Sequence, residues 1–264
     1  MLNSEQIRNF YNDFTEYLIK DRIYPNARIL QIFRSLDDIF KSHRVKSALE
    51  IGCGIGIISE HIRKSVPTVY AVDLSESNIR FASSTVNKVN FVCGDFLEVQ
   101  LGQKFDLITL FDVLEHFPQS LHHKVFKRIQ DYSKPSTLLA VTIPDADFLD
   151  CYRQHFPEKL QIVDESIHFE AFLSYLKPVD LEIMKFHRFG IDYENQYRYY
   201  LLNYRPAGFA LKKRTLPKPS WIKLALSKAI IKAQIQFRKL KYAGYRQRLG
   251  DARRTTTSVV GVEQ

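Results

Sequence analysis

Ala48-Leu49-Glu50-Ile51-Gly52-Cys53-Gly54-Ile55-Gly56 is a short apolar run that ends in a loop with glycine at every second position. The residues that follow it, 57–62, have the pattern of a beginning helix. Glycines at such a junction permit a tight turn and let a ligand approach the backbone. The spacing differs from the Gly-x-Gly-x-x-Gly of dinucleotide loops, and the absence of Gly-Lys-Ser/Thr excludes a P-loop. Glu50, two residues before the first glycine, favours a ligand with an amine or hydroxyl groups over a pyrophosphate.

Three more apolar runs end in an acidic residue, in the order and at the spacing of strand–helix units. They are Val69-Tyr70-Ala71-Val72-Asp73-Leu74-Ser75, Phe91-Val92-Cys93-Gly94-Asp95-Phe96 and Phe105-Asp106-Leu107-Ile108-Thr109-Leu110-Phe111-Asp112-Val113-Leu114-Glu115-His116-Phe117. Together with the glycine loop, they resemble the motifs of class I S-adenosylmethionine (SAM)-dependent methyltransferases. The Asp-Val-Leu-Glu-His ending is similar to that of the ubiquinone-biosynthesis O-methyltransferases and their small-molecule relatives. The resemblance covers residues 45–145 well and the rest loosely.

The resemblance implies an α/β fold: a Rossmann-like, seven-stranded, mostly parallel sheet with helices on both faces, N-terminal helices, a helical lid and a basic C-terminal helix. The alternation of β-rich and helical runs also favours a parallel sheet covered on both faces. We expect strands near 48–51, 69–73, 90–93, 106–111 and 137–143, and helices near 56–65, 76–86 and 119–131. The run 181–187 is β-like, and 197–202 is expected to be a last strand, which the family would pair antiparallel.

The chain is expected to have three regions. Residues 1–45 form an N-terminal helical cap, 46–211 a SAM-binding methyltransferase domain with a lid insertion at 144–180, and 212–264 a basic amphipathic extension. A parallel sheet binds its ligand beyond the carboxyl ends of its strands. The glycine loop and the acids of the other motifs all fall at such ends, which predicts one composite site.

These residues are the candidate cofactor site. The resemblance implies that Asp73 binds both ribose hydroxyls and that Asp95 contacts the adenine amine, although Asp73 could instead cap the next helix and Asp95 could be a turn residue. Glu50 would organise the amino-acid moiety of the cofactor, or it could simply be a satisfied polar residue at a strand end. The chain at Asp112 would line the methionine end of the cofactor. The expected cofactor-binding residues are Glu50, Gly52, Cys53, Gly54, Gly56, Asp73, Leu74, Asp95, Phe96 and Asp112.

Two histidines are candidates for the general base of methyl transfer. His116 closes the fourth motif, and a neutral imidazole can accept a phenol or alcohol proton; it could equally cap its loop. His168 lies in the expected lid, where related enzymes often carry a histidine, or it is a residue at the edge of the core. His122 and His123 begin a helix and are expected to be solvated.

Two features of the motifs concern other ligands. Tyr11 and Tyr17 in the N-terminal helices could cover the cofactor's sulfonium by cation–π contact, or could be ordinary packing residues. Glu115 and His116 are too few for a convincing metal site, so no metal is expected.

The composition is that of a globular protein, with 264 residues, 45% hydrophobic and 25% charged. The three cysteines stand singly, without a Cys-x-x-Cys, which favours a reducing compartment. No apolar run approaches the roughly 20 residues of a membrane span, and the start shows no secretory signal, so a cytoplasmic location is expected.

The net charge of +9 is concentrated near the C-terminus, where residues 212–264 hold 14 Lys/Arg and 2 Asp/Glu. Apolar residues share one face of a helix predicted over 217–250. This helix could pack on the core or lie peripherally on an anionic membrane. It could also bind nucleic acid, which we consider unlikely because few aromatic residues are interleaved.

The sequence therefore predicts a SAM-dependent methyltransferase that yields S-adenosyl-L-homocysteine (SAH). Its acceptor would be a hydroxyl on a small molecule, sugar or lipid-linked compound, methylated by in-line transfer with a histidine general base. An N-methyltransferase of a small amine and an RNA-directed methyltransferase that uses the basic tail remain as alternatives. A non-catalytic SAM-binding protein is disfavoured because the glycines, Asp73 and Asp95 are intact.

Overall fold

The structure, a computed structural model, describes residues 4–13, 15–23 and 25–205. The chain divides into two units, residues 1–207 and 208–264, and every described residue lies in the first. The extension 212–264 and the basic helix predicted over 217–250 lie outside the described residues.

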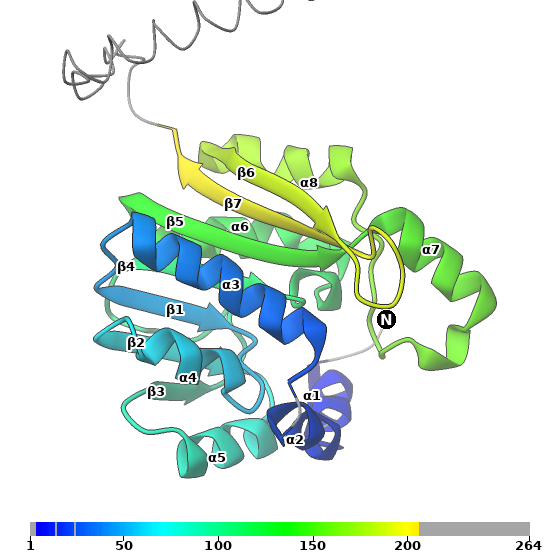
Figure 1. Ribbon diagram of the computed structural model, residues 1–264, viewed down its shortest axis with the longest axis horizontal. Helices are drawn as coiled ribbons and strands as arrows, with labels where there is room; N and C mark the ends of the chain where they lie inside the picture. The colour runs from blue at the N-terminus through cyan, green and yellow to red at the C-terminus, as the bar shows by residue number, and fades with distance from the viewer. Residues whose placement is uncertain (1–3, 14, 24, 206–264) are drawn as a thin grey trace, which may run out of the picture. The chain divides into compact units, whose positions relative to one another are not determined.

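A seven-stranded sheet forms the centre of the described unit, in the order β3-β2-β1-β4-β5-β7-β6 (Figure 1). The strands are β1 (Ser47–Ile51), β2 (Thr68–Asp73), β3 (Asn90–Cys93), β4 (Phe105–Phe111), β5 (Ser133–Pro144), β6 (Leu181–Phe189) and β7 (Tyr197–Tyr204). β1 to β5 are parallel, and β7 runs antiparallel to both β5 and β6. The predicted mostly parallel sheet, with its antiparallel last strand, is confirmed.

Helices cover both faces of this sheet. The α-helices are α1 (Ser4–Asp13), α2 (Thr15–Ile23), α3 (Ala27–Ser42), α4 (Ile57–Arg63), α5 (Glu76–Thr85), α6 (His122–Asp131), α7 (Ala146–His155) and α8 (Phe169–Leu176). Short 3-10 turns lie at η1 (Leu114–His116), η2 (Gln119–Leu121), η3 (Pro157–Lys159) and η4 (Lys177–Val179). One apolar cluster joins α3 and α4 to the sheet, and a second joins α6 and α8 to it. Because both faces are covered, β1 is buried along its whole length.

The sequence explains why α3 belongs to the core. Its buried residues Ile29, Ile32, Leu36 and Ile39 recur at helical spacing, so they form one apolar stripe. Asn26 caps the helix by accepting a hydrogen bond from the Ile29 amide at 3.0 Å.

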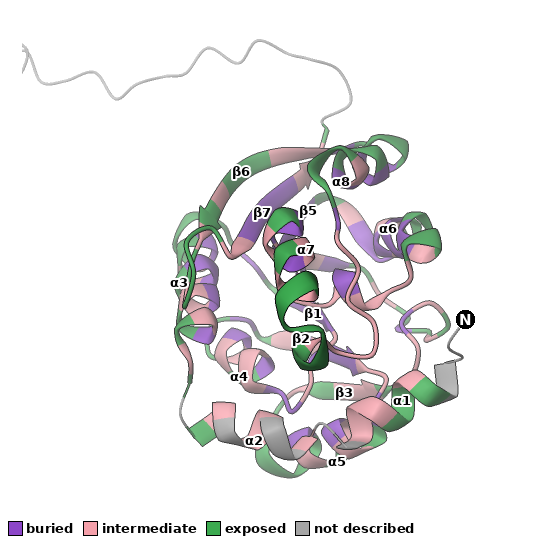
Figure 2. Cartoon of the chain, turned by 90° about the vertical axis from the view of Figure 1, so that its right-hand side faces the viewer, coloured by how far each residue is buried: buried purple, intermediate pink, exposed green. Residues whose placement is uncertain are grey.

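The expected N-terminal cap and lid each divide into a core part and a part at the site. α3 and α8 pack on the sheet, whereas α1, α2 and the segment 146–164 contribute residues to a cavity beyond the carboxyl ends of the strands, to which the first residues of α3 also contribute. α7 lies in front of those strand ends, and its outer face is exposed (Figure 2). Within the expected lid insertion, 144–180, the residues that line the cavity all lie between 144 and 164.

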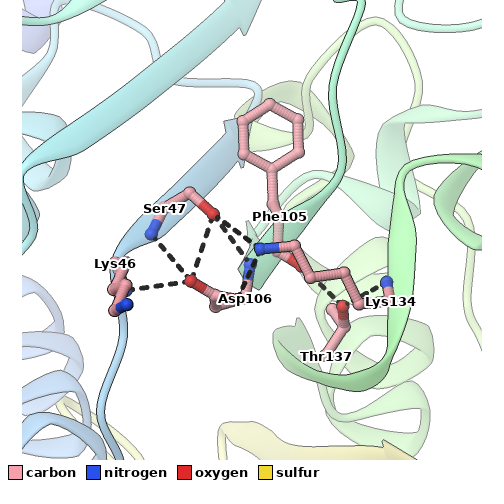
Figure 3. A network of polar contacts seen from close by, with 6 residues as sticks. All are labelled: Lys46, Ser47, Phe105, Asp106, Lys134 and Thr137. Carbon is pink, nitrogen blue, oxygen red and sulfur yellow. Dashed lines mark hydrogen bonds and ion pairs between the residues drawn. The ribbon is translucent and has the colours of Figure 1, made fainter.

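The opposite end of the sheet holds a polar network around Asp106 (Figure 3). The Asp106 carboxylate accepts hydrogen bonds from the amides of Lys46 and Ser47 at 2.9 and 3.0 Å, and it pairs with Lys134 Nζ at 2.6 Å. Burial acts to raise the pKa of Asp106, but these hydrogen bonds and the Lys134 charge lower it. The network ties together the starts of β1, β4 and β5.

Candidate functional site

A cavity of about 600 Å³ lies at the carboxyl ends of the parallel strands. Its floor is formed by the loops after β1, β2, β3 and β4. Ile7, Tyr11 and Leu18 of the N-terminal helices form one wall, and Phe148 and Tyr152 of α7 form part of another. Nine of the ten expected cofactor-binding residues line it: Glu50, Gly52, Cys53, Gly54, Asp73, Leu74, Asp95, Phe96 and Asp112.

The glycine loop lets the backbone itself border the cavity. Gly52 has φ +70°, and a Cβ there would lie 2.4 Å from Val113 Cγ2, so a side chain would be both strained and crowded. Gly56 does not line the cavity. It precedes α4 with φ +79°, and a Cβ would press on Phe91 and Ala82, so its role in the structure is close packing behind the loop.

Asp73, at the end of β2, connects the glycine loop to the next helix. Its Oδ2 accepts the Gly54 amide at 2.7 Å, and its Oδ1 accepts the Ser75 amide at 2.9 Å and the Asn78 side chain at 3.3 Å. Burial raises the pKa of Asp73, and these hydrogen bonds oppose the rise. A carboxylate can accept about four hydrogen bonds, so Asp73 retains capacity for a ligand hydroxyl. The alternative that Asp73 itself caps the next helix is wrong, because the cap of α5 is Ser75, whose hydroxyl accepts a hydrogen bond from the Asn78 amide.

Glu50 is 2% exposed and lies behind the loop. One carboxylate oxygen accepts a hydrogen bond from Ser59. Burial raises the pKa of Glu50 to about 8, with the Ser59 hydrogen bond opposing and the Asp73 charge reinforcing the rise. Cys53 is also buried, which raises the pKa of its thiol, so it lines the cavity as a small apolar group.

Asp95, Leu74 and Phe96 border the cavity from the loops after β2 and β3. Asp95 Oδ1 accepts the Leu97 amide at 2.9 Å, which is the turn geometry that the sequence allowed. Asp95 also lines the cavity, as an adenine contact requires. The contact itself stays a prediction.

Asp112 is held by the protein itself. Its Oδ2 pairs with Arg28 Nη1 at 2.8 Å, and its Oδ1 accepts the Thr142 hydroxyl at 2.9 Å. Arg28 comes from α3, 84 residues away, and it also lines the cavity. The sequence contains no local signal for this pair. Asp112 contacts Arg28 through Nη1. The other N–H groups of the guanidinium can still donate to an anionic ligand group such as a carboxylate.

His116 lies in η1 and is 15% exposed at its side chain. Its Nδ1 is 2.7 Å from the Val163 carbonyl and 3.2 Å from Asp164 Oδ1. Burial acts to lower the pKa of His116, but the Asp164 hydrogen bond and the Glu115 and Asp164 charges raise it to about 9. Asp164 also lines the cavity, and sequence reasoning missed it.

Two further polar groups face this end of the cavity without a partner among the described residues: Tyr11 OH and Glu115 Oε2. The Tyr11 ring lies edge-on to His116, with centroids 5.8 Å apart. Burial raises the pKa of Glu115 to about 8. Buried polar atoms without partners are costly, so both groups suit a ligand that supplies hydrogen bonds.

The other candidate residues lie elsewhere. His168 is half exposed outside the cavity lining, with its Nε2 3.4 Å from Asp150. The expectation that His122 is solvated is wrong: it is fully buried, its Nε2 lies 2.9 Å from the Phe117 carbonyl, and its ring packs edge-on to Tyr175. His123 is exposed as expected. The Tyr17 side chain lies outside the described part of the chain.

Among the described residues, no three His, Cys, Asp or Glu side chains are grouped so as to hold a metal ion. In the same residues, no helix has the length and apolar character needed to cross a bilayer.

Comparison with known proteins places this geometry in a family. A family model described as a methyltransferase domain matches residues 22–189. The chain is 26% identical over 181 residues to the malonyl-[acyl-carrier protein] O-methyltransferase of Priestia megaterium. This alignment covers 66% of this chain and 65% of that protein. It is 37% identical over 78 residues to the ubiquinone biosynthesis O-methyltransferase of Coxiella burnetii, 28% of this chain and 33% of that protein. The chain thus spans less than two thirds of the length of these curated relatives.

Solved structures share the fold. The magnesium protoporphyrin IX methyltransferase of Synechocystis PCC 6803 with bound SAH superposes with a TM-score of 0.62 at 15% identity, covering 77% of this chain and 100% of that one. An N-methyltransferase of Bradyrhizobium japonicum WM9 in complex with SAH gives 0.59 at 17% identity, covering 75% and 100%. The predicted Rossmann-like methyltransferase architecture is therefore confirmed, and so is the family resemblance.

Proposed function

Because the chain belongs to the methyltransferase-domain family, we propose that it is a SAM-dependent methyltransferase whose acceptor is a hydroxyl group. The observation that carries this proposal is that the glycine loop, Asp73 and His116 line the same cavity. One end thus offers backbone and carboxylate groups for a nucleoside, and the other offers a histidine for proton transfer.

The residues present fit the cofactor. Asp73 keeps acceptor capacity for a ribose hydroxyl, and Arg28 is a cation for the carboxylate of an amino acid. Tyr11 and Glu115 offer an aromatic ring and an unpartnered carboxylate oxygen, which suit a cation. When bound, the cofactor supplies a methyl group activated on a sulfonium.

Deprotonation of the acceptor falls to His116. With Nδ1 directed at Val163 and Asp164, Nε2 is the ring nitrogen available to a hydroxyl. Its pKa of about 9 makes the imidazole cationic at neutral pH in the free protein. A cationic ligand in the same cavity lowers that pKa, since like charges disfavour each other. The base therefore becomes available as the cavity fills.

The lining also limits the acceptor. Glu115 and Asp164 are acidic, and Phe148 and Tyr152 are aromatic. Such a lining favours a ring that carries hydroxyl groups and disfavours a carboxylate, which the Asp164 carboxylate would repel. An amine is the second candidate, because the same carboxylates suit an ammonium group.

Calorimetric titration of the full chain with SAH, with NAD as control, tests the cofactor. Micromolar binding of SAH without binding of NAD is the expected result, and a well-folded protein that binds neither would contradict the proposal. Transfer of labelled methyl from SAM to matched phenol, sugar, amine and carboxylate acceptors then tests the acceptor class. His116→Gln should lower transfer to a hydroxyl about 100-fold or more, whereas an amine that is neutral at the assay pH needs no such base.

We also propose peripheral membrane contact through 217–250, supported by the concentration of positive charge in residues 212–264. Flotation of full-length protein and a 1–211 truncation with anionic liposomes tests it. Equal flotation of the two would remove the proposal. A salt-sensitive RNA shift that requires residues 212–264 would instead favour the RNA-directed alternative.

A further inference from the structure

A short stretch of the segment 146–167 lies directly against the turn that carries His116. The Val163 carbonyl is 2.7 Å from His116 Nδ1, and the Glu165 amide donates to the Glu115 carbonyl at 2.8 Å. Between these contacts, Asp164 Oδ1 lies 3.2 Å from the same His116 nitrogen. Val163 and Glu165, the two neighbours of Asp164, are thus anchored to His116 and Glu115, two consecutive residues of η1.

This arrangement fixes the tautomer of His116. A carbonyl oxygen and a carboxylate oxygen can only accept, so the proton must reside on Nδ1. The lone pair of the neutral ring is then on Nε2. A histidine whose second nitrogen is held by a carboxylate is both oriented and made more basic.

Asp164 is itself held in place by Gln161, three residues before it, and by Arg153 of α7. Its Oδ2 accepts the Gln161 amide at 2.7 Å, and its backbone carbonyl accepts a hydrogen bond from Arg153 Nη2. Arg153 Nη1 also contacts Asp150 at 2.7 Å and Ser166 at 2.9 Å. Arg153 of α7 therefore holds both ends of the stretch 164–166, through the Asp164 carbonyl and the Ser166 hydroxyl.

We propose that Asp164 is the positioning residue for the His116 base and that Arg153 couples Asp164 to α7, so that His116 is a competent base only while the segment 146–167 lies over the cavity. This inference rests on the proposed function. His168, the other candidate base, belongs to this group of contacts: its Nε2 lies 3.4 Å from Asp150, and it does not line the cavity.

The charges around His116 come from several elements. Glu115 is its neighbour in η1, Asp112 ends β4, and Asp164 approaches from the segment after η3. The Tyr11 ring of α1 covers the imidazole, and the Arg28 cation lies beyond Asp112. Asp164 is the only one of these carboxylates with a direct contact to the ring that the structure shows, so its removal should act most strongly on His116.

The test measures the His116 imidazole by NMR titration in the full chain, with the signal assigned by its loss in His116→Gln. Asp164→Asn should lower the pKa of His116 by at least about one unit, because the opposite charge is removed. Arg153→Met should lower it in the same direction by less, since Asp164 remains but is held loosely. Asp147→Asn, on the exposed first turn of α7, is the matched control and should leave the titration unchanged.

A purely structural role for Asp164 would lower stability and leave the titration as in the wild type, and that result would overturn the inference. If Asp164→Asn does not fold, the titration of His116 in Arg153→Met serves as the test, and a lowered pKa of His116 is again the expected result. A wild-type titration in Arg153→Met would remove the proposed coupling to α7.

Kinetics separate this inference from the proposed function. The ascending limb of the pH profile of kcat/KM reports deprotonation of the base. In Asp164→Asn this limb should move to lower pH by the amount seen in the titration, and Arg153→Lys should lie closer to wild type than Arg153→Met. If the titration shifts and the rate profile does not, the pairing of Asp164 with His116 stands and the role of His116 as base fails. If neither shifts, the inference fails while SAH binding remains a separate question.

Discussion

Carboxyl groups at the two ends of the sheet differ in their hydrogen bonding and in the direction of their pKa shifts. At the amino-terminal end, Asp106 is surrounded by amide and lysine donors that lower its pKa. At the carboxyl end, burial raises the pKa of Glu50 and Glu115 to about 8, and Glu115 Oε2 has no partner in the described residues. The first arrangement stabilises the fold by itself, whereas the second leaves groups that a ligand can satisfy. Incomplete satisfaction, and not polarity alone, marks the functional end.

The largest expected effect on stability comes from replacing a glycine at each end of the sheet by alanine. Gly52→Ala, at the carboxyl end, meets left-handed strain and Val113 at 2.4 Å, so the free energy of unfolding should fall by about 3 kcal/mol. Gly102→Ala, near the start of β4, has φ +68° but nothing within 4 Å, so strain alone should cost about 1 kcal/mol. Urea denaturation measures both. Equal losses would show that the loop has no special close approach.

The next effect concerns the two aspartates. Asp73→Asn should weaken SAH binding about 100-fold, because a carboxylate that accepts the ligand hydroxyl and the Gly54 amide is lost. Asp106→Asn should lower the free energy of unfolding and leave SAH affinity within about twofold, since its network lies at the other end of the sheet. Calorimetry and thermal denaturation on both variants give the readings. A similar loss of affinity in both would break the comparison.

A third prediction uses pH. The folded pKa of Glu50 is raised to about 8 from 4.5, so the folded state binds more protons than the unfolded state between those values. The contribution of Glu50 is therefore most favourable below pH 4.5 and is lost as the pH rises towards 8. In the absence of ligand, Glu50→Gln should flatten the fall in stability between about pH 5 and 7 by about 2 kcal/mol. An unchanged slope would mean that Glu50 is ionised and satisfied in the fold.

The same contrast explains what the sequence could and could not predict. The strands, the glycine loop and the acids at strand ends follow from local patterns, and they were predicted within a few residues. The pairs Arg28–Asp112 and His116–Asp164 join residues far apart in the chain, and a single charged residue has no local signature for its partner. Asp145 differs from these pairs because its role is local. It caps α7 by accepting a hydrogen bond from the Asp147 amide, and an aspartate before a helical run is a typical cap that the sequence can predict.

The histidines show the same limit from another side. The burial of His122 depends on Tyr175 of α8, whose packing on the sheet could not be read from an aromatic-rich run. The segment 144–180 was expected to be one lid, but α8 supplies Phe172 and Leu176 to the core. Helical spacing predicts which residues share a face, and only tertiary packing decides what that face meets.

The smallest expected effect tests whether the N-terminal helices belong to the functional end. Asn12 Oδ1 accepts the Ser75 hydroxyl at 2.8 Å and the Ser77 amide at 3.3 Å, next to Asp73 in sequence. Asn12→Ala should weaken SAH binding about fivefold, because one or two hydrogen bonds that hold α1 beside the cavity are lost. Asn9→Ala, exposed on the same helix, is the matched control and should bind SAH as the wild type does. If Asn12→Ala changes only stability, α1 is a support for the fold, and the functional end is confined to the strand ends and the segment 146–167. If affinity falls without a loss of stability, α1 helps to close the cavity over its ligand.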